Sequence, residues 1–255
     1  MATARNNRKR KRSRRRFAPL FKLLCVLTAA AALVLGATVF FQVETIQVSG
    51  NSRYTQEEIV SAVGIETGDN LFLMNKFQLI EQAEERLPYL ESVTIRRSLP
   101  STIVITVTEW EAVARVPAQD GSWLISVGGK LLEQAGGEAG DIEITGLTAL
   151  APQPGKALAV SQEETPRLEA MLELLAVLEE QGMRERVSAM ELSSTRITME
   201  YEGRFTVKLL LNADFEYRMK VLLKVVEDLN QRMGDQVRGT VDLTQEEFPG
   251  AFSPE

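Results

Sequence analysis

The chain has 255 residues, which is enough for one large domain or two small ones beside a terminal segment. It contains no histidine and a single cysteine at position 25, so the part that follows cannot form metal sites built on imidazole or thiolate, or catalytic triads that need histidine. Residues 1–42 carry ten Lys and Arg and no acidic residue, which leaves 19 basic against 35 acidic residues and a net charge of −16 beyond them, so nucleic acid is not expected as a partner there.

An apolar stretch at 23–41 holds 19 residues without a charge. At ~1.5 Å rise per residue, a helix of this length measures roughly 28 Å, close to the hydrocarbon thickness of a bilayer. The basic segment 1–22 precedes it and Glu44 follows it. Because lysine and arginine mark the cytoplasmic end of a spanning helix, we expect a single-pass protein of the cell membrane, with a cytoplasmic N-terminus and residues 43–255 outside the cytoplasm.

Other interpretations of this N-terminal region are weaker. A cleaved signal peptide usually has an apolar region of ~7–15 residues that ends in small residues, whereas this run is longer and ends in Val39, Phe40 and Phe41. A buried core helix seldom runs this long without a charge. The basic tail by itself resembles a nucleic-acid or nuclear-targeting patch, but directly before a spanning helix its plainer role is orientation and attraction to anionic lipids.

Residues 43–111 predict a small domain with the order strand, helix, helix, strand, strand. The alternation of apolar and polar side chains predicts strands at 43–48, 93–97 and 102–109. Two helices that cover one face of a three-stranded sheet complete a domain of this size.

Capping signals predict both helices of this domain. Thr55 and Glu58 form the pattern of a capping box, and Gly64 ends the first helix. Asn75 is expected to cap the second helix, which Pro88 ends. Helical spacing predicts an apolar face on the second helix that consists of Phe77, Leu79, Ile80, Ala83 and Leu87.

Residues 112–245 predict a second mixed domain that is rich in strand, followed by a tail at 246–255. Hairpin turns are expected at 120–121 and 128–129, where Asp-Gly and Gly-Gly separate short apolar runs. Strands are expected at 113–116, 123–127, 130–132, 187–192, 195–201, 204–211 and 237–243, and helices at 166–182 and 213–230. The predicted fold class is therefore α+β.

Residues 43–255 contain none of the sequence motifs that are typical of catalytic sites. Paired carboxylates occur at helix starts, on helix surfaces and in the tail, all of which are ordinary solvated positions. Gly128, Gly129 and Lys130 lie in a predicted hairpin rather than between a strand and a helix, so they are not expected to cradle a phosphate. We expect no catalytic, cofactor or metal site and no small-molecule substrate.

The ordered combination of these features resembles the POTRA domain. It is most similar to the FtsQ-type POTRA domain that follows a single N-terminal anchor in the FtsQ/DivIB cell-division proteins, down to the alternating apolar pattern at 103–109. The residues 241–243, Val-Asp-Leu, are similar to a short motif in the last strand of that family's second domain. Two features depart from the family: the junction 109–114 lacks the usual proline, and 244–245 lacks the aromatic residue of some members.

This resemblance implies a non-catalytic scaffold of the bacterial division machinery. Members of the family are found at the division septum, bind FtsB/DivIC-like and FtsL-like proteins, and help regulate septal peptidoglycan synthesis. A partner segment could add to the last strand, 237–243, if that strand lies at a sheet edge. The candidate partner-binding residues are Val241, Asp242, Leu243, Phe248 and Phe252.

Alternatives exist for both the site and the function. The last strand could instead be internal, with the two phenylalanines in a disordered end. As a function, a POTRA-containing protein for polypeptide transport or assembly at the envelope is the second candidate. An extracytoplasmic cell-wall enzyme is the third, and the missing nucleophile and metal ligands count against it.

Overall fold

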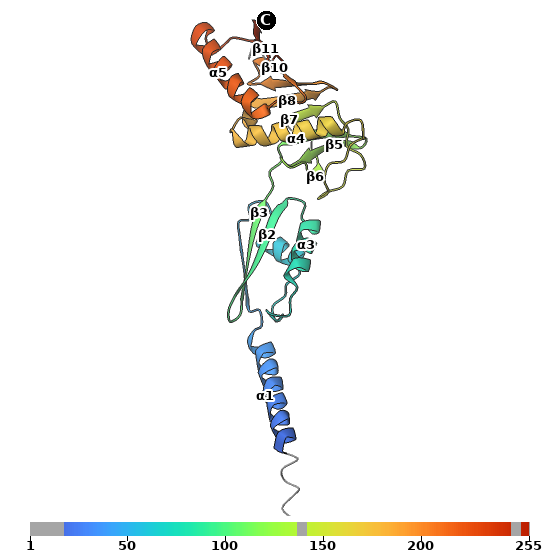
Figure 1. Ribbon diagram of the computed structural model, residues 1–255, viewed down its shortest axis with the longest axis vertical. Coiled ribbons are helices and arrows are strands. Elements are labelled where there is room, and N and C mark those ends of the chain that lie inside the picture. Colours follow the sequence, from blue (N-terminus) through green and yellow to red (C-terminus); the bar gives the residue numbers. More distant parts are fainter. Residues whose placement is uncertain (1–17, 137–141, 246–250, 255) are drawn as a thin grey trace, which may run out of the picture.

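The computed structural model describes residues 18–136, 142–245 and 251–254. Three parts follow one another along the long axis of the molecule: a helix, a small domain and a larger sheet domain (Figure 1). The two domains both combine helices with sheets, which confirms the predicted α+β class.

Helix α1, Ala18–Phe40, contains most of the apolar stretch predicted from the sequence. Its large apolar side chains that the structure describes are all at least 57% exposed. Across the described part of the chain, no helix combines the length and apolarity needed to cross a membrane, so the span predicted at 23–41 stays a prediction.

The small domain is built on a three-stranded sheet with the order β1-β3-β2. Strand β1 (Thr45–Ser49) runs parallel to β3 (Thr102–Glu109), and β2 (Leu90–Ser98) runs antiparallel to it. Helices α2 (Gln56–Val63) and α3 (Lys76–Arg86) cover one face of this sheet. The order strand, helix, helix, strand, strand is the one predicted.

The first helix begins and ends as its capping residues predict. Thr55 Oγ1 accepts a hydrogen bond from the backbone N–H of Glu58 (3.2 Å), and a carboxylate oxygen of Glu58 accepts one from the backbone N–H of Thr55 (2.8 Å). Gly64 then adopts a left-handed conformation, with φ of 76°, and its N–H bonds the carbonyl of Val60. By contrast, the side chain of Asn75 makes no capping hydrogen bond at the start of α3.

One residue of the predicted apolar face of α3 points away from the core. Ala83 is buried and Leu79, Ile80 and Leu87 pack against the core, but Phe77 is 84% exposed. At 3.6 residues per turn, Phe77 lies roughly 110° around the helix from the centre of that stripe, which is too far to share its contacts. The prediction for Phe77 was therefore wrong.

The large domain is a nine-stranded sheet with the order β12-β11-β10-β9-β8-β7-β4-β5-β6. The strands are β4 (Ala114–Ala118), β5 (Gly121–Ile125), β6 (Leu131–Gln134), β7 (Ile142–Thr145), β8 (Val187–Leu192), β9 (Arg196–Tyr201), β10 (Phe205–Leu210), β11 (Gly239–Asp242) and β12 (Ala251–Pro254). Strands β7 and β12 were not predicted, and β12 lies in the segment 246–255 that was expected to be a tail.

Two helices enter this domain as crossovers between parallel strands. Helix α4 (Thr165–Glu180) connects β7 to β8, a short 3-10 turn at Arg184–Arg186 precedes β8, and α5 (Phe215–Met233) connects β10 to β11. Parallel neighbours need such a connection because a tight turn can join only antiparallel strands. The two helices contact each other on the same face of the sheet.

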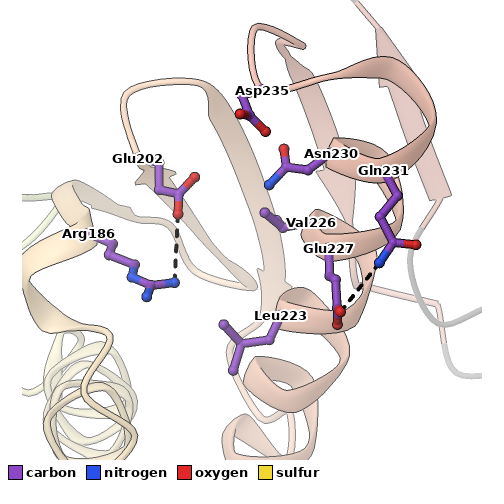
Figure 2. Close-up of a pocket in the computed structure, with 8 residues that line it drawn as sticks. All are labelled: Arg186, Glu202, Leu223, Val226, Glu227, Asn230, Gln231 and Asp235. Atoms are coloured by element: carbon purple, nitrogen blue, oxygen red, sulfur yellow. Dashed lines mark hydrogen bonds and ion pairs between the residues drawn. The ribbon is translucent and has the colours of Figure 1, made fainter.

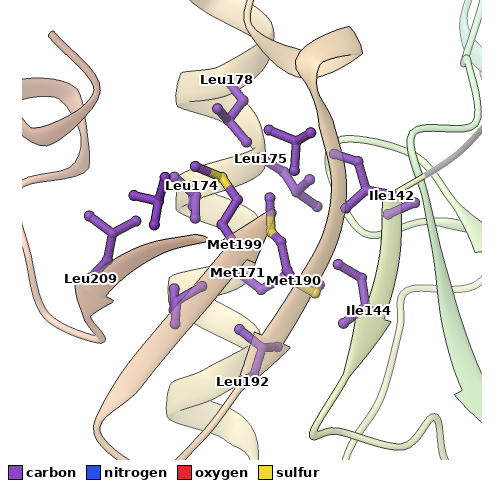
Figure 3. Close-up of a cluster of buried hydrophobic side chains, with 14 of the residues drawn as sticks. Ile142, Ile144, Met171, Leu174, Leu175, Leu178, Met190, Leu192, Met199 and Leu209 are labelled. Atoms are coloured by element: carbon purple, nitrogen blue, oxygen red, sulfur yellow. The ribbon is translucent and has the colours of Figure 1, made fainter. Parts of the chain in front are cut away.

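The core of the large domain lies between these helices and the sheet. Figure 3 shows Met171, Leu174, Leu175 and Leu178 of α4 facing the strands. The labelled side chains opposite them come from four neighbouring strands: Ile142, Ile144, Met190, Leu192, Met199 and Leu209. Burial of this alternating strand face against the helical stripe provides the main stabilisation of the domain.

Candidate protein-docking site

A partner strand can add only to a sheet edge that is still open, and the large sheet has edges at β6 and β12. The outer side of β6 is partly covered at its first residue, because Leu131 N–H bonds the carbonyl of Lys156 (2.8 Å) and the Leu131 carbonyl accepts from Gly155 N–H (2.7 Å). On the opposite side, β11 is the only strand that pairs with β12 within the residues that the structure describes. Among the described residues, the outer side of β12 is therefore the more open edge of the sheet.

The last predicted strand is internal rather than an edge. Strand β11 lies between β10, to which it is parallel, and β12, to which it is antiparallel. Val241 and Leu243 are completely buried, and Val241 pairs with Val207 on one side and Phe252 on the other. The sequence left open whether the last predicted strand is an edge or internal, and it is internal. The terminal segment, which the second alternative expected to be disordered, forms a strand at Ala251–Pro254.

Asp242 takes part in the turn that follows β11. Its Oδ1 accepts hydrogen bonds from the backbone N–H (2.9 Å) and the hydroxyl (2.6 Å) of Thr244. Burial raises the pKa of Asp242, but these two hydrogen bonds, with help from the nearby positive charges of Lys208 and Arg196, outweigh it and lower the pKa. This carboxylate therefore holds the backbone of its own chain.

Leu243 also contributes a hydrogen bond to its own sheet. Its N–H bonds the carbonyl of Lys208 on β10 (2.9 Å). If β11 were an edge strand, Leu243→Pro would remove a hydrogen-bond donor that a partner could use. Because β11 is internal, the same substitution would break the bond to Lys208 instead. That substitution would test folding and not docking.

Phe252 holds β12 onto the domain. The side chain is half-buried and packs against the core, and its ring lies edge-to-face with that of Phe205 at a centroid distance of 6.4 Å. Gly239 permits this close approach, because a Cβ there would lie 2.3 Å from the carbonyl oxygen of Ser253 and 2.8 Å from the Phe252 ring. Phe248 lies outside the described residues.

A hollow lies between α5, the turn before β8 and the turn after β9, and several of its polar side chains contact one another. Figure 2 shows that Arg186 faces Glu202 and that Glu227 contacts Gln231. The Arg186–Glu202 ion pair measures 3.7 Å, and Arg204 bonds Asn230 Oδ1 at 3.2 Å. In the described part of the chain, no group of three or more acidic or cysteine side chains could hold a metal ion.

A second polar cluster joins the two domains. Glu133 Oε1 of the large domain accepts hydrogen bonds from Tyr89 Oη (2.8 Å) and Arg53 Nη2 (2.9 Å) of the small domain. The Arg53 guanidinium also lies 3.8 Å from the centroid of the Tyr89 ring. Lys130 Nζ donates to the carbonyl of Leu90 (2.9 Å) across the same junction. The sequence offered no signal for this cluster, because its members are far apart along the chain.

Two comparisons with known proteins each match part of the chain. A family model described as the POTRA domain, FtsQ-type, matches residues 41–110. Cell division protein FtsQ of Corynebacterium glutamicum is 31% identical over 124 residues, which is 49% of this chain and 55% of that protein. Cell division protein DivIB of Clostridium botulinum is 31% identical over 124 residues, which is 49% of this chain and 48% of that protein.

A third relative extends the same pattern. Cell division protein DivIB of Geobacillus kaustophilus is 34% identical over 114 residues, which is 45% of this chain and 41% of that protein. The chain thus spans about half the length of the curated relatives that it matches. A solved structure of the major extracytoplasmic domain of DivIB from Geobacillus stearothermophilus aligns at 13% identity with a TM-score of 0.31, over 49% of this chain and 98% of that one, a likeness too low to bear on the fold.

Proposed function

We propose, from the premise that this chain carries an FtsQ-type POTRA domain and resembles the FtsQ/DivIB cell-division proteins, that it is a non-catalytic scaffold of the bacterial division machinery. In this role it is anchored in the cell membrane and binds FtsB/DivIC-like and FtsL-like division proteins through its extracytoplasmic domains. The observation that carries the proposal is the family match at 41–110, which begins directly after α1.

The membrane anchor is part of this proposal. It is supported by the charge-free run at 23–41, by the basic residues before it, and by the exposure of the large apolar side chains along α1. A helix that is apolar on all sides and packs on no core is typical of one surrounded by lipid. Its orientation, with the basic N-terminal segment in the cytoplasm, follows from the distribution of charge.

We place the edge to which a partner strand would add at the outer side of β12. An exposed strand presents backbone N–H and C=O groups that a partner segment can pair with, and here the tail of the chain itself supplies that strand. Val241 and Leu243 support the edge from the core, and Phe252 fixes β12 through its contact with Phe205. The candidate residues therefore act mainly by holding the edge strand in place.

Localisation tests the function directly. We expect a fluorescent fusion of the full chain to concentrate at the septum of dividing bacteria, and the full chain to retain an FtsB/DivIC-like protein from detergent-solubilised membranes. An even distribution around the cell, together with no retention of such a partner, would refute the division role. Release of soluble fragments from peptidoglycan by the purified chain would refute the non-catalytic part of the proposal.

A further inference from the structure

The end of the POTRA domain that adjoins α1 exposes large apolar side chains from two regions, the start of α3 with the connector before it, and the turn between β2 and β3. Phe72 and Leu73 lie in the connector before α3, Phe77 lies in its first turn, and Leu99 lies in the turn between β2 and β3. Their exposed fractions are 52%, 78%, 84% and 57%. We call these four residues the apolar tip. Exposed apolar side chains gathered at one place mark an interaction surface more often than isolated ones do.

Aromatic contacts connect the apolar tip to the end of α1. The rings of Phe40 and Phe41 meet edge-to-face with centroids 5.1 Å apart, and Phe41 meets Phe72 in the same way at 5.1 Å. Apolar surface therefore continues from the last turn of the helix onto the POTRA domain. The turn that holds Leu99 also lies close by, because Pro100 and Phe40 line one shared hollow.

Backbone hydrogen bonds fix the short linker between α1 and the domain. Leu71 N–H bonds the carbonyl of Phe41 (2.9 Å), and Val43 exchanges bonds with the neighbouring loop, donating to Asp69 and accepting from Gly68, both at 2.8 Å. The linker is thus held like an added strand along the loop that carries Phe72. The position of the apolar tip relative to the end of α1 is set by these bonds.

The length of the linker limits how far the domain can stand from a membrane that contains α1. Strand β1 begins at Thr45, so only four residues separate it from Phe40 at the end of the helix. Fully extended, four residues span at most ~14 Å. Figure 1 shows the loops of the small domain ending beside the last turn of α1. If α1 spans the bilayer, these loops must lie at its surface.

We propose that the apolar tip inserts into the headgroup and acyl-chain boundary of the extracytoplasmic leaflet, so that the POTRA domain rests on the lipid. This inference rests on the membrane anchor of the proposed function and adds a second membrane contact to it. Apolar side chains at the interface gain from leaving water, as they do in interfacial helices. Arg97 lies next to the tip: its guanidinium is 5.6 Å from the centroid of the Phe72 ring and donates to the carbonyl of Met74 (3.2 Å), so it adds a positive charge that can attract lipid phosphates.

Lipid quenching in nanodiscs tests this contact on the full chain. An environment-sensitive fluorophore is attached to Leu73→Cys or Phe77→Cys in a Cys25→Ser background, and the discs contain phosphatidylcholine and phosphatidylglycerol with a nitroxide-bearing lipid. Met233→Cys is the matched control, since this residue is 57% exposed at the end of α5 in the other domain. The wild-type protein labelled at its exposed native cysteine, Cys25, reports on α1 itself.

We expect the fluorescence of the labels at 73 and 77 to shift to shorter wavelength and to be largely quenched by the nitroxide lipid. The fluorescence of the label at 233 should be quenched little. Labels at 73 and 77 that behave like the one at 233, with the Cys25 label quenched, would overturn the inference and leave the anchor standing, which would point to a protein as the occupant of the tip. An unquenched Cys25 label would overturn the anchor and this inference together.

Discussion

The carboxylate of Glu109 shows how one residue can organise a loop of the POTRA domain. It accepts hydrogen bonds from the backbone N–H (2.9 Å) and hydroxyl (2.7 Å) of Ser52 and from the backbone N–H of Arg53 (2.7 Å) and Tyr54 (3.2 Å). Burial alone would raise the pKa of Glu109, but these four hydrogen bonds outweigh it, so the pKa is lowered.

A lowered pKa in the folded state makes stability depend on pH. We expect the contribution of Glu109 to be present above the ordinary pKa of a carboxyl group and to be lost as the pH falls through its folded value. Glu109→Gln should therefore destabilise the domain by ~1–3 kcal/mol at neutral pH and by much less in acid. Urea unfolding of the full chain at about pH 7 and at about pH 2, well below the ordinary pKa of a carboxyl group, measures this.

The exposed Glu85 of α3 provides the control for this measurement. Glu85→Gln should change stability little at either pH. If the cost of Glu109→Gln is the same at both pH values, the ionised carboxylate is not what holds the loop.

Gly146 illustrates a backbone position that no side chain can occupy. Its φ is +88°, and an added Cβ would lie 1.9 Å from the carbonyl oxygen of Leu192. We expect Gly146→Ala to lower the free energy of unfolding by about 3 kcal/mol or more, as judged by urea unfolding. Gly203→Ala is the matched control, because its φ of +62° carries similar strain in open space, and it should cost only ~1–2 kcal/mol. Equal costs would exclude the clash as the cause.

At the scale of elements, the short strand β12 decides which surface of the large sheet remains open. The strand contributes four residues, and in the described part of the chain it is attached by pairing with β11 and by the packing of Phe252 on the core, including its ring contact with Phe205. Loss of that contact should release β12 and expose the edge of β11, while the buried core behind it stays intact.

Phe252→Ser tests the role of this strand. We expect faster amide hydrogen exchange at 251–254 and weaker binding of an FtsB/DivIC-like partner, with a stability cost of about 1–2 kcal/mol because the ring is only half-buried. Ser253→Ala, exposed on the same strand, should alter neither quantity. Unchanged partner binding despite faster exchange would show that the partner docks elsewhere.

At the scale of the whole molecule, the cluster at Glu133 holds the two domains in one arrangement. Its ion pair with Arg53 is about half exposed and contributes little stability, ~1 kcal/mol or less. The hydroxyl of Tyr89 and the stacking of Arg53 on its ring add directional contacts to the same point. The cluster therefore acts on domain orientation more than on folding.

We expect Glu133→Ala to widen the range of domain orientations without unfolding either domain. Double electron–electron resonance measures the distance distribution between two spin labels. The labels are attached at Glu57→Cys on α2 and Lys224→Cys on α5, in a Cys25→Ser background. The distribution should broaden in Glu133→Ala and keep its width in Glu173→Ala, a change at an exposed position on α4. An unaltered distribution would mean that other contacts set the orientation.

Features that depend on neighbouring residues along the chain could be predicted from the sequence. The capping box at Thr55, the alternation within β3 and the apolar stripes of α4 and α5 arise from spacing, and spacing is local. The resemblance to FtsQ-type POTRA domains could be recognised for the same reason, since its elements follow one another without interruption.

Features that depend on residues far apart in the chain became visible when the fold was known. Strand β7 has only four residues, too few for its alternation to be recognised before its parallel neighbours are known. Phe77 is exposed because a different face of α3 packs on the core. Whether β11 is an edge depends on β12, and β12 is held by a ring 47 positions earlier in the chain, at Phe205. Local patterns cannot encode such pairings, because burial is shared between segments that meet only when the chain folds.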